Sequence, residues 1–203
     1  MSFSGQSNYN HDGVSPKTGV LLTNLGTPDA PTAKALRVYL KEFLSDPRVV
    51  EIPRLVWALI LHAFILTFRP AKSAKLYASI WTKEGSPLWV ISQRQAKKLQ
   101  QKLDDLYGSE TIPVVMGMRY GNPSIASAID QLTQLNVRNL IVLPLYPQYS
   151  GATGGSTFDC VAQHLKSMRW VPELKLINGY HNHPQYLKAL ASSIEKHIQQ
   201  HGS

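Results

Sequence analysis

Residues 140–157, LIVLPLYPQYSGATGGST, carry the strongest fold signal in this sequence. An apolar run over 140–145 is followed by two tyrosines and then by a stretch rich in glycine, serine and threonine. A nearly unbroken apolar run of this length is typical of a strand that is covered on both faces of a parallel sheet. Open α/β sheets bind their ligands just beyond such strands. The segment therefore predicts a buried strand that leads into a candidate binding loop.

Further strand and helix patterns surround this segment. Besides the run at 140–145, β-rich runs occur at 19–24, 112–118 and 174–178. Helical patterns occur at 33–44, 88–106, 124–135, 158–168 and 186–198, and the second of these is expected to turn Leu99, Leu103 and Leu106 inward. Strands that alternate with helices predict an α/β fold, with a doubly wound, four-stranded parallel sheet flanked by helices in the manner of a Rossmann-like half.

The composition limits the class of protein and its partners. With 43% hydrophobic residues, the chain is expected to form one packed domain over residues 18–203. Residues 1–17 are polar and turn-forming, and we interpret them as a flexible N-terminal extension without a secretory signal. The single cysteine, Cys160, suits the reducing cytoplasm. The net charge of +8 favours acidic small molecules or an anionic membrane surface, but no basic cluster interleaved with aromatics points to nucleic acid.

The segment 53–70, PRLVWALILHAFILTFRP, departs from the alternation of strands and helices. Its apolar stretch is shorter than the roughly 20 residues that a bilayer span needs. One interpretation is a buried helix, and the other is a helix in the membrane interface with Arg54 and Arg69 at its ends. An apolar lip that faces a ligand is compatible with both.

The loop that follows residue 145 allows two kinds of ligand. Its glycines and the next helix could cradle a phosphate, but the P-loop lysine and the dinucleotide spacing are missing. Tyr146 and Tyr149 offer flat apolar surface with a polar tip, which suits a planar macrocycle with carboxylate arms. Those arms could be met by the helix N-terminus and by the hydroxyls of Ser150, Ser156 and Thr157.

Three other motifs each have a functional and a structural interpretation. Arg119, at a strand end, could pair with a ligand carboxylate or tie down a neighbouring loop. His181 and His183 could hold a passing metal ion or serve as a helix cap, and a structural zinc site is not expected. The turn at 83–88 has the capping sequence Gly-Ser-Pro, and with the aromatic segment 77–81 before it this turn could line a cleft.

Four stretches in sequence order carry a family resemblance. They read GVLLTNLGTPDAP (19–31), YASIWTKEGSPL (77–88), VVMGMRYGNPSI (114–125) and IVLPLYPQYSGATGGST (141–157). Together they resemble ferrochelatases of the bacterial type, enzymes that insert Fe(II) into protoporphyrin IX to make haem. The resemblance covers most of residues 19–190, and the last stretch is the most specific. The segment 53–70 is similar to the family's hydrophobic active-site lip, which also meets the membrane.

By position, the resemblance implies a set of site residues. The residues expected to bind porphyrin are Leu25, Ser86, Arg119, Tyr120, Tyr146, Tyr149 and Ser150. Tyr120 matches a residue directed at the metal side, and His183 matches a position near the outer metal path. Gly151 stands where animal members carry a cysteine that ligates an iron–sulfur cluster, so no cluster is expected.

The resemblance also implies where the chemistry takes place. In the family, the metal-insertion histidine and its opposed glutamate lie in the second half, beyond residue 203. The chain is therefore expected to be an N-terminal domain that supplies part of the porphyrin cleft and is inactive alone, with no permanently bound cofactor. Its expected partners are protoporphyrin IX, Fe(II) as substrate, the missing second domain and the inner membrane face. The alternative is a non-catalytic module that binds a tetrapyrrole or a metal for delivery.

Overall fold

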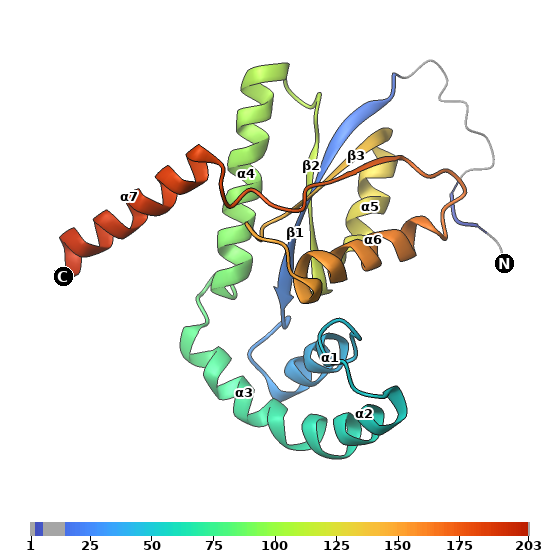
Figure 1. Cartoon of the computed structure of the whole chain (residues 1–203), viewed down its shortest axis with the longest axis vertical. Helices are drawn as coiled ribbons and strands as arrows, with labels where there is room; N and C mark the ends of the chain where they lie inside the picture. Colours follow the sequence, from blue (N-terminus) through green and yellow to red (C-terminus); the bar gives the residue numbers. More distant parts are fainter. Residues whose placement is uncertain (1–2, 6–14, 203) are drawn as a thin grey trace.

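The described part of the chain forms a four-stranded parallel sheet flanked by helices (Figure 1). The structure, a computed structural model, describes residues 3–5 and 15–202. The strands are β1 (Lys17–Thr27), β2 (Val114–Gly121), β3 (Val137–Pro144) and β4 (Glu173–Leu176), in the order β2-β1-β3-β4. The predicted α/β class and all four predicted strands are confirmed.

Most of the N-terminal extension expected at residues 1–17 lies outside the described residues. Within it, the Ser4 backbone N–H donates to the Ser167 carbonyl, and Lys17 already belongs to β1.

The order of the strands makes the sheet doubly wound. The chain leaves β1 through α4 (Pro87–Tyr107) to reach β2, and then crosses back over β1 through α5 (Ile125–Gln134) to reach β3. The helix α6 (Ser156–Leu165) continues in the same direction to β4. Because right-handed crossovers in opposite directions place their helices on opposite faces, α4 covers one face, and α5 and α6 cover the other.

The main core lies between the sheet and α5 and α6. The inward stripe predicted for α5, formed by Ile125, Ile129 and Leu132, is buried against β1 and β3. Ser124 caps this helix, since its hydroxyl accepts a hydrogen bond from the Ser127 N–H. The apolar spacing and the cap thus agree on where α5 begins and on which of its faces is buried.

A layer of helices lies below the carboxyl ends of the strands (Figure 1). It consists of α1 (Ala33–Leu44), α2 (Arg54–Ile60), the π-helical turn η1 (Leu61–Ile65) and α3 (Leu66–Ile80). A second core joins α1 and α3 to the end of β2, and Leu36, Tyr39 and Tyr120 belong to it. This layer closes the edge of the sheet at which ligands are expected.

The long apolar helix runs further than the sequence predicted. Pro70 lies inside α3 and does not end it, so helix continues from Arg54 to Ile80, 27 residues in all. By length and composition alone this helix could cross a membrane, and 17% of its most apolar window is buried. The helix is therefore not too short to cross a bilayer, as the sequence had suggested. It is also not a buried core helix, because most of its apolar window is not buried.

Three other local predictions differ from the structure. Leu106 was expected to face inward but is 60% exposed in the last turn of α4. The helix expected at 158–168 is α6, which begins at Ser156. The segment expected to be a loop forms the π-helical turn η2 (Gly151–Gly155) directly before it. Three of its five residues are glycines, and the low helix propensity of glycine hid this turn in the sequence.

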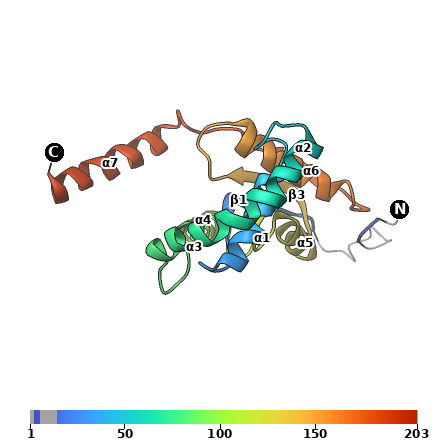
Figure 2. The same cartoon turned by 90° about the horizontal axis from the view of Figure 1, so that it is seen from below.

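The last helix, α7 (Pro184–His201), extends away from the rest of the chain in both views (Figures 1 and 2). None of its side chains is buried. Its apolar stripe, formed by Leu187, Leu190, Ile194 and Ile198, is exposed.

Candidate functional site

Two glycines keep β1 and β2 paired up to their carboxyl ends. Gly26 (φ +105°) pairs with Tyr120, and Gly121 (φ +82°) pairs with Thr27. A Cβ atom on Gly26 would lie 1.8 Å from the Tyr120 carbonyl oxygen, so only glycine fits. This close approach brings the end of β1 next to Asn122, the residue that follows β2.

A pocket of about 360 Å³ opens at this edge of the sheet. Three segments form it: the end of β1 with the two residues after it, the turn between α3 and α4 together with the first turn of α4, and the residue after β2. The lining residues are Thr27, Pro28, Asp29, Trp81, Lys83, Glu84, Gly85, Ser86, Trp89 and Asn122. Of the turn at 83–88 and the aromatic segment 77–81, which could line a cleft, residues 83–86 and Trp81 do so.

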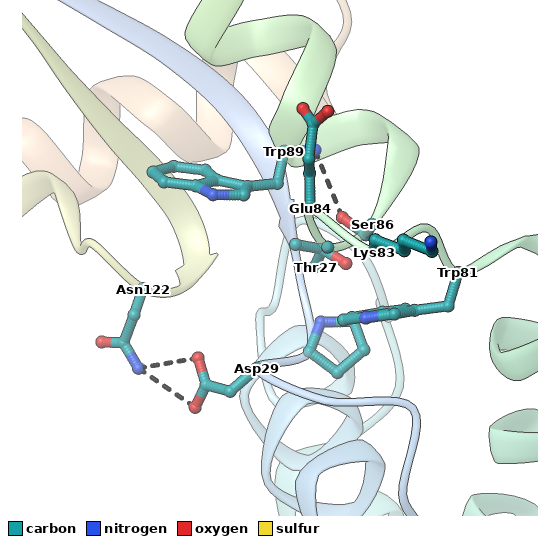
Figure 3. A pocket seen from close by; sticks show the side chains of 10 residues that line it. Thr27, Asp29, Trp81, Lys83, Glu84, Ser86, Trp89 and Asn122 are labelled. Atoms are coloured by element: carbon teal, nitrogen blue, oxygen red, sulfur yellow. Dashed lines mark hydrogen bonds between the residues drawn. The ribbon is translucent and has the colours of Figure 1, made fainter.

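Two indole rings and a hydroxyl dominate the interior of this pocket. Trp89 and Trp81 lie on opposite sides of Thr27 (Figure 3). The Thr27 side chain is buried, and its hydroxyl has no hydrogen-bond partner among the described residues. A buried hydroxyl without a partner costs free energy unless a ligand or water pairs with it. The pocket therefore offers flat apolar walls with one polar group between them.

Charged and capping groups surround the entrance. The Asn122 amide donates to both carboxylate oxygens of Asp29, at 3.1 and 3.2 Å (Figure 3). Glu84 pairs with Arg94 at 3.1 Å, and both side chains are exposed. The Ser86 hydroxyl caps α4 by accepting from the Trp89 N–H, as the Gly-Ser-Pro signal predicted. The cap fixes the first turn of α4 and with it the position of the Trp89 backbone.

A second polar cluster lies buried where β2 meets the helical layer. One carboxylate oxygen of Asp46 accepts hydrogen bonds from Arg119 Nη2 (2.5 Å) and the Tyr120 hydroxyl (2.7 Å). It also accepts from the Ser156 hydroxyl (2.5 Å). The other oxygen accepts from the Arg48 backbone N–H at 2.8 Å. Asp46 thus joins the loop before α2, the end of β2 and the start of α6.

Asp46 stays ionised despite its burial. Burial alone would raise the pKa of this carboxyl, but the hydrogen bonds from Ser156 and Tyr120, with the nearby Arg119 charge, lower the pKa below its ordinary value. The Arg119 guanidinium lies 4.4 Å above the centre of the Tyr120 ring, which adds a cation–π contact. Both carboxylate oxygens of Asp46 are hydrogen-bonded, so the cluster connects its three segments rigidly. We call Asp46, Arg119, Tyr120 and Ser156 the joint.

Beside this joint, Arg48 connects the helical layer to the tyrosine loop. Its guanidinium forms two hydrogen bonds to the Asp159 carboxylate, at 2.5 and 2.9 Å. A Cβ atom on Gly155 would lie 2.9 Å from Arg48 and 3.2 Å from the Tyr149 hydroxyl. Arg48, Tyr149 and the η2 turn therefore pack together.

The three tyrosines of the expected site have different environments. Tyr120 was expected to face an open cleft, but its side chain is fully buried because Asp46 and Ser156 bind its hydroxyl. The Tyr146 hydroxyl is also buried, and burial raises the pKa of both phenols. Tyr149 is 59% exposed and is free to contact a ligand. None of the three lines the pocket between the indole rings.

The remaining residues predicted for the site are likewise partly buried and partly exposed. Ser156 and Thr157 were expected to meet ligand carboxylates, but both are fully buried. Ser150 is exposed, and its carbonyl accepts the Gly155 N–H of the η2 turn. Leu25 packs against the second core, and Ser86 lines the pocket. Arg119 ties down a neighbouring loop, which was its structural interpretation.

His183 is an N-cap in this structure. Its Nδ1 accepts the Gln185 N–H at 3.3 Å, at the start of α7. This is the capping role that the sequence allowed.

Comparison with known proteins decides the family. The family model named Ferrochelatase matches residues 17–203. The chain belongs to the ferrochelatase family. It is 55% identical to a ferrochelatase of Thioalkalivibrio sulfidiphilus and 52% identical to one of Alcanivorax borkumensis, in each case over 100% of the chain. These matches cover 54% and 59% of the two relatives, so this ferrochelatase-family chain spans about half the length of the curated relatives it matches.

Some site residues of this ferrochelatase-family chain were missed at the sequence level. Thr27 and Asn122 were not singled out, although they end or follow strands at the expected edge. Trp89 was assigned only to a helix, and its position in the first turn after the Ser86 cap could have revealed it. Asp46 and Arg48 were also missed, because their side-chain partners lie more than 70 residues away.

Proposed function

We propose that this chain is the porphyrin-binding part of a ferrochelatase, which inserts Fe(II) into protoporphyrin IX and releases two protons. The observation that carries the proposal is the pocket between Trp81 and Trp89 at the carboxyl edge of the sheet, in a chain of this family. Flat aromatic walls at this edge suit one face of a planar macrocycle. With about 360 Å³, the pocket is at the small end of ligand sites, so it would hold one edge of the ring.

The surfaces beside the pocket would extend this contact. On one side, the exposed apolar residues Leu76 and Ile80 of α3 lead up to Trp81. The Tyr149 ring is exposed on the loop after β3. The joint around Asp46 holds the helical layer and this loop in a fixed relation, so little ordering would be needed when a ring binds.

The described residues account for binding of the macrocycle better than for removal of its protons. Insertion of a metal requires that two pyrrole N–H protons leave the ring, and a general base titrating near neutral pH serves this step best. Asp46 is ionised but is enclosed by Arg119, Tyr120 and Ser156, which makes it a positioning group. Binding energy from the edges of the macrocycle would offset the cost of bending it. The base would come from the part of the family's length that this chain does not span.

We also propose that the helix from Arg54 to Ile80 lies on a membrane surface. The helix carries four basic residues and no acidic ones, and many of its large apolar side chains are exposed. Both features suit an anionic bilayer interface, as does the net charge of +8. A cytoplasmic protein that binds the inner membrane face peripherally would use this helix to receive an apolar substrate.

We further propose that no iron–sulfur cluster is bound at Gly151. Glycine offers no ligand atom, and the space around its Cβ position is open. Fe(II) would enter only as substrate.

The binding proposal is tested by titrating protoporphyrin IX into the full chain and following quenching of its fluorescence. Trp81→Ala and Tyr149→Ala are expected to weaken binding by about tenfold each, because each removes an aromatic contact of about 1 kcal/mol together with its buried area. Trp170→Ala, an indole on the loop before β4, is the matched control and is expected to leave binding unchanged. Absence of binding by a folded chain would contradict the proposal.

An insertion assay with Fe(II) or Zn(II) tests whether this chain carries a base of its own. Because the base is expected outside this chain, stoichiometric porphyrin binding without product is the expected result, both for a cleft domain and for a delivery module. Turnover would show that the described residues include a sufficient base.

A further inference from the structure

Two imidazoles occupy adjacent turns at the end of α7. His197 and His201 are four residues apart, so they lie on one face of the helix. Their ring centres are 4.4 Å apart, and the ring planes differ by 20°. Both side chains are exposed. Two histidines at this spacing on a helix are a known arrangement of metal ligands.

One hydrogen bond fixes which ring nitrogen of His201 carries the proton. Its Nδ1 lies 3.2 Å from the His197 carbonyl oxygen. Since a carbonyl oxygen only accepts, Nδ1 carries the proton, and in the neutral ring the lone pair is on Nε2. A backbone carbonyl that holds one ring nitrogen in this way is the usual support for a metal-binding histidine.

The C-terminal end of α7, where these two histidines lie, also favours binding of a cation. The last carbonyls of a helix have no partners within the helix, and they make its C-terminus negative. Two nitrogens on one metal ion can be up to about 4 Å apart, because each bond is about 2.0 to 2.1 Å long. The stacked rings are close enough for this, but their planes are nearly parallel, so both exposed side chains must rotate before their nitrogen lone pairs point at one ion.

We infer that His197 and His201 form a bidentate site for a borderline divalent transition metal, such as Ni(II), Cu(II) or Zn(II). Imidazole prefers these ions over Mg²⁺ and Ca²⁺. No group of three or more candidate ligands occurs in the part of the chain that the structure describes, so water fills the other positions. The site is independent of the porphyrin pocket and of the proposed function.

The test is a calorimetric titration of the full chain with nickel chloride, above the ordinary histidine pKa of about 6.5. One Ni(II) per chain is expected at the tightest site. The exchange variant Lys196→His/His197→Lys keeps the composition and the charge but moves one imidazole off the shared face. It is expected to weaken this site at least about tenfold, as loss of a supporting ligand contact does. His181→Ala, which leaves the His183 cap of α7 in place, is expected to leave the affinity unchanged.

A second readout does not depend on affinity. Nickel that bridges two turns would slow amide exchange over residues 197–201 in the parent chain and not in the exchange variant. Equal affinity of the parent and the exchange variant would overturn the inference, as would loss of binding in the control that lacks His181.

Discussion

At the scale of single residues, Asp46 holds more of the site together than any residue that the sequence pointed to. Asp46→Ala would leave the Arg119 guanidinium and the Tyr120 and Ser156 hydroxyls without their shared acceptor. Removal of one partner from a buried ion pair costs about 3 to 5 kcal/mol. We expect the free energy of unfolding to fall by that amount in urea titrations. Asp159→Ala, which breaks the exposed pair with Arg48, is the control and should cost less than about 1 kcal/mol.

The same carboxyl makes stability depend on pH. The pKa of Asp46 is lowered in the folded chain, so the ionised form favours folding. This contribution is present above the ordinary value of 3.8 and is lost as the pH falls through the lower folded value. The difference in unfolding free energy between the parent and Asp46→Asn should therefore shrink on acidification below about pH 4. A constant difference across that range would contradict the assignment.

Gly26 is needed for a steric reason, because no side chain fits at this position. Gly26→Ala would place a methyl group 1.8 Å from the Tyr120 carbonyl oxygen at a φ of +105°. Because backbone on both sides is fixed by strand pairing, we expect a loss of about 3 kcal/mol or more. Gly151→Ala is the matched control, since nothing lies within 4 Å of its Cβ position. Thermal unfolding of both variants compares the two directly, and similar midpoints would show that the strand ends can separate.

At the scale of elements, the exposed apolar side chains of the long helix predict membrane binding without a role in folding. Phe64 and Phe68 are 60% and 71% exposed. Phe64→Ser/Phe68→Ser should lower affinity for anionic lipid vesicles by at least about tenfold, because burial of each ring contributes about 1.5 to 3 kcal/mol. Thermal stability should hardly change. Leu106→Ser, an exposed apolar change on α4, is the control for flotation, and equal loss in both variants would point to nonspecific adsorption.

Helices and strands that depend on local sequence patterns could be predicted from the sequence. Hydrogen bonds between buried residues far apart in the sequence could not. The spacing of Ile125, Ile129 and Leu132 placed α5 correctly, because burial of one helix face depends on nearby sequence. The burial of Tyr120 and Ser156 depends on Asp46, which is 74 and 110 residues away. At the pocket, the capping signal at Ser86 located the turn, but the opposition of Trp81 and Trp89 required the fold. Sequence patterns therefore found the edge of the sheet, while long-range contacts decided which side chains are open there.

At the scale of the whole molecule, packing is unevenly distributed, and local stability should follow it. The stripe on α5 is fully buried, whereas α7 buries no side chain along its 18 residues. Most of the stability of helices in proteins comes from tertiary packing of one face, and α7 has no such packing. We expect amide hydrogen exchange over α7 to be much faster than over α5, where only global unfolding should expose the backbone.

The dependence of this exchange on protein concentration is the control. Protection of α7 equal to that of α5 at all dilutions would mean that the helix packs against the rest of the same chain, contrary to the arrangement in Figure 1. Protection that appears only at high concentration would mean that the exposed stripe of Leu187, Leu190, Ile194 and Ile198 pairs with a second copy. Fast exchange at every concentration is the expected result, since an apolar stripe stabilises a helix only when another surface covers it.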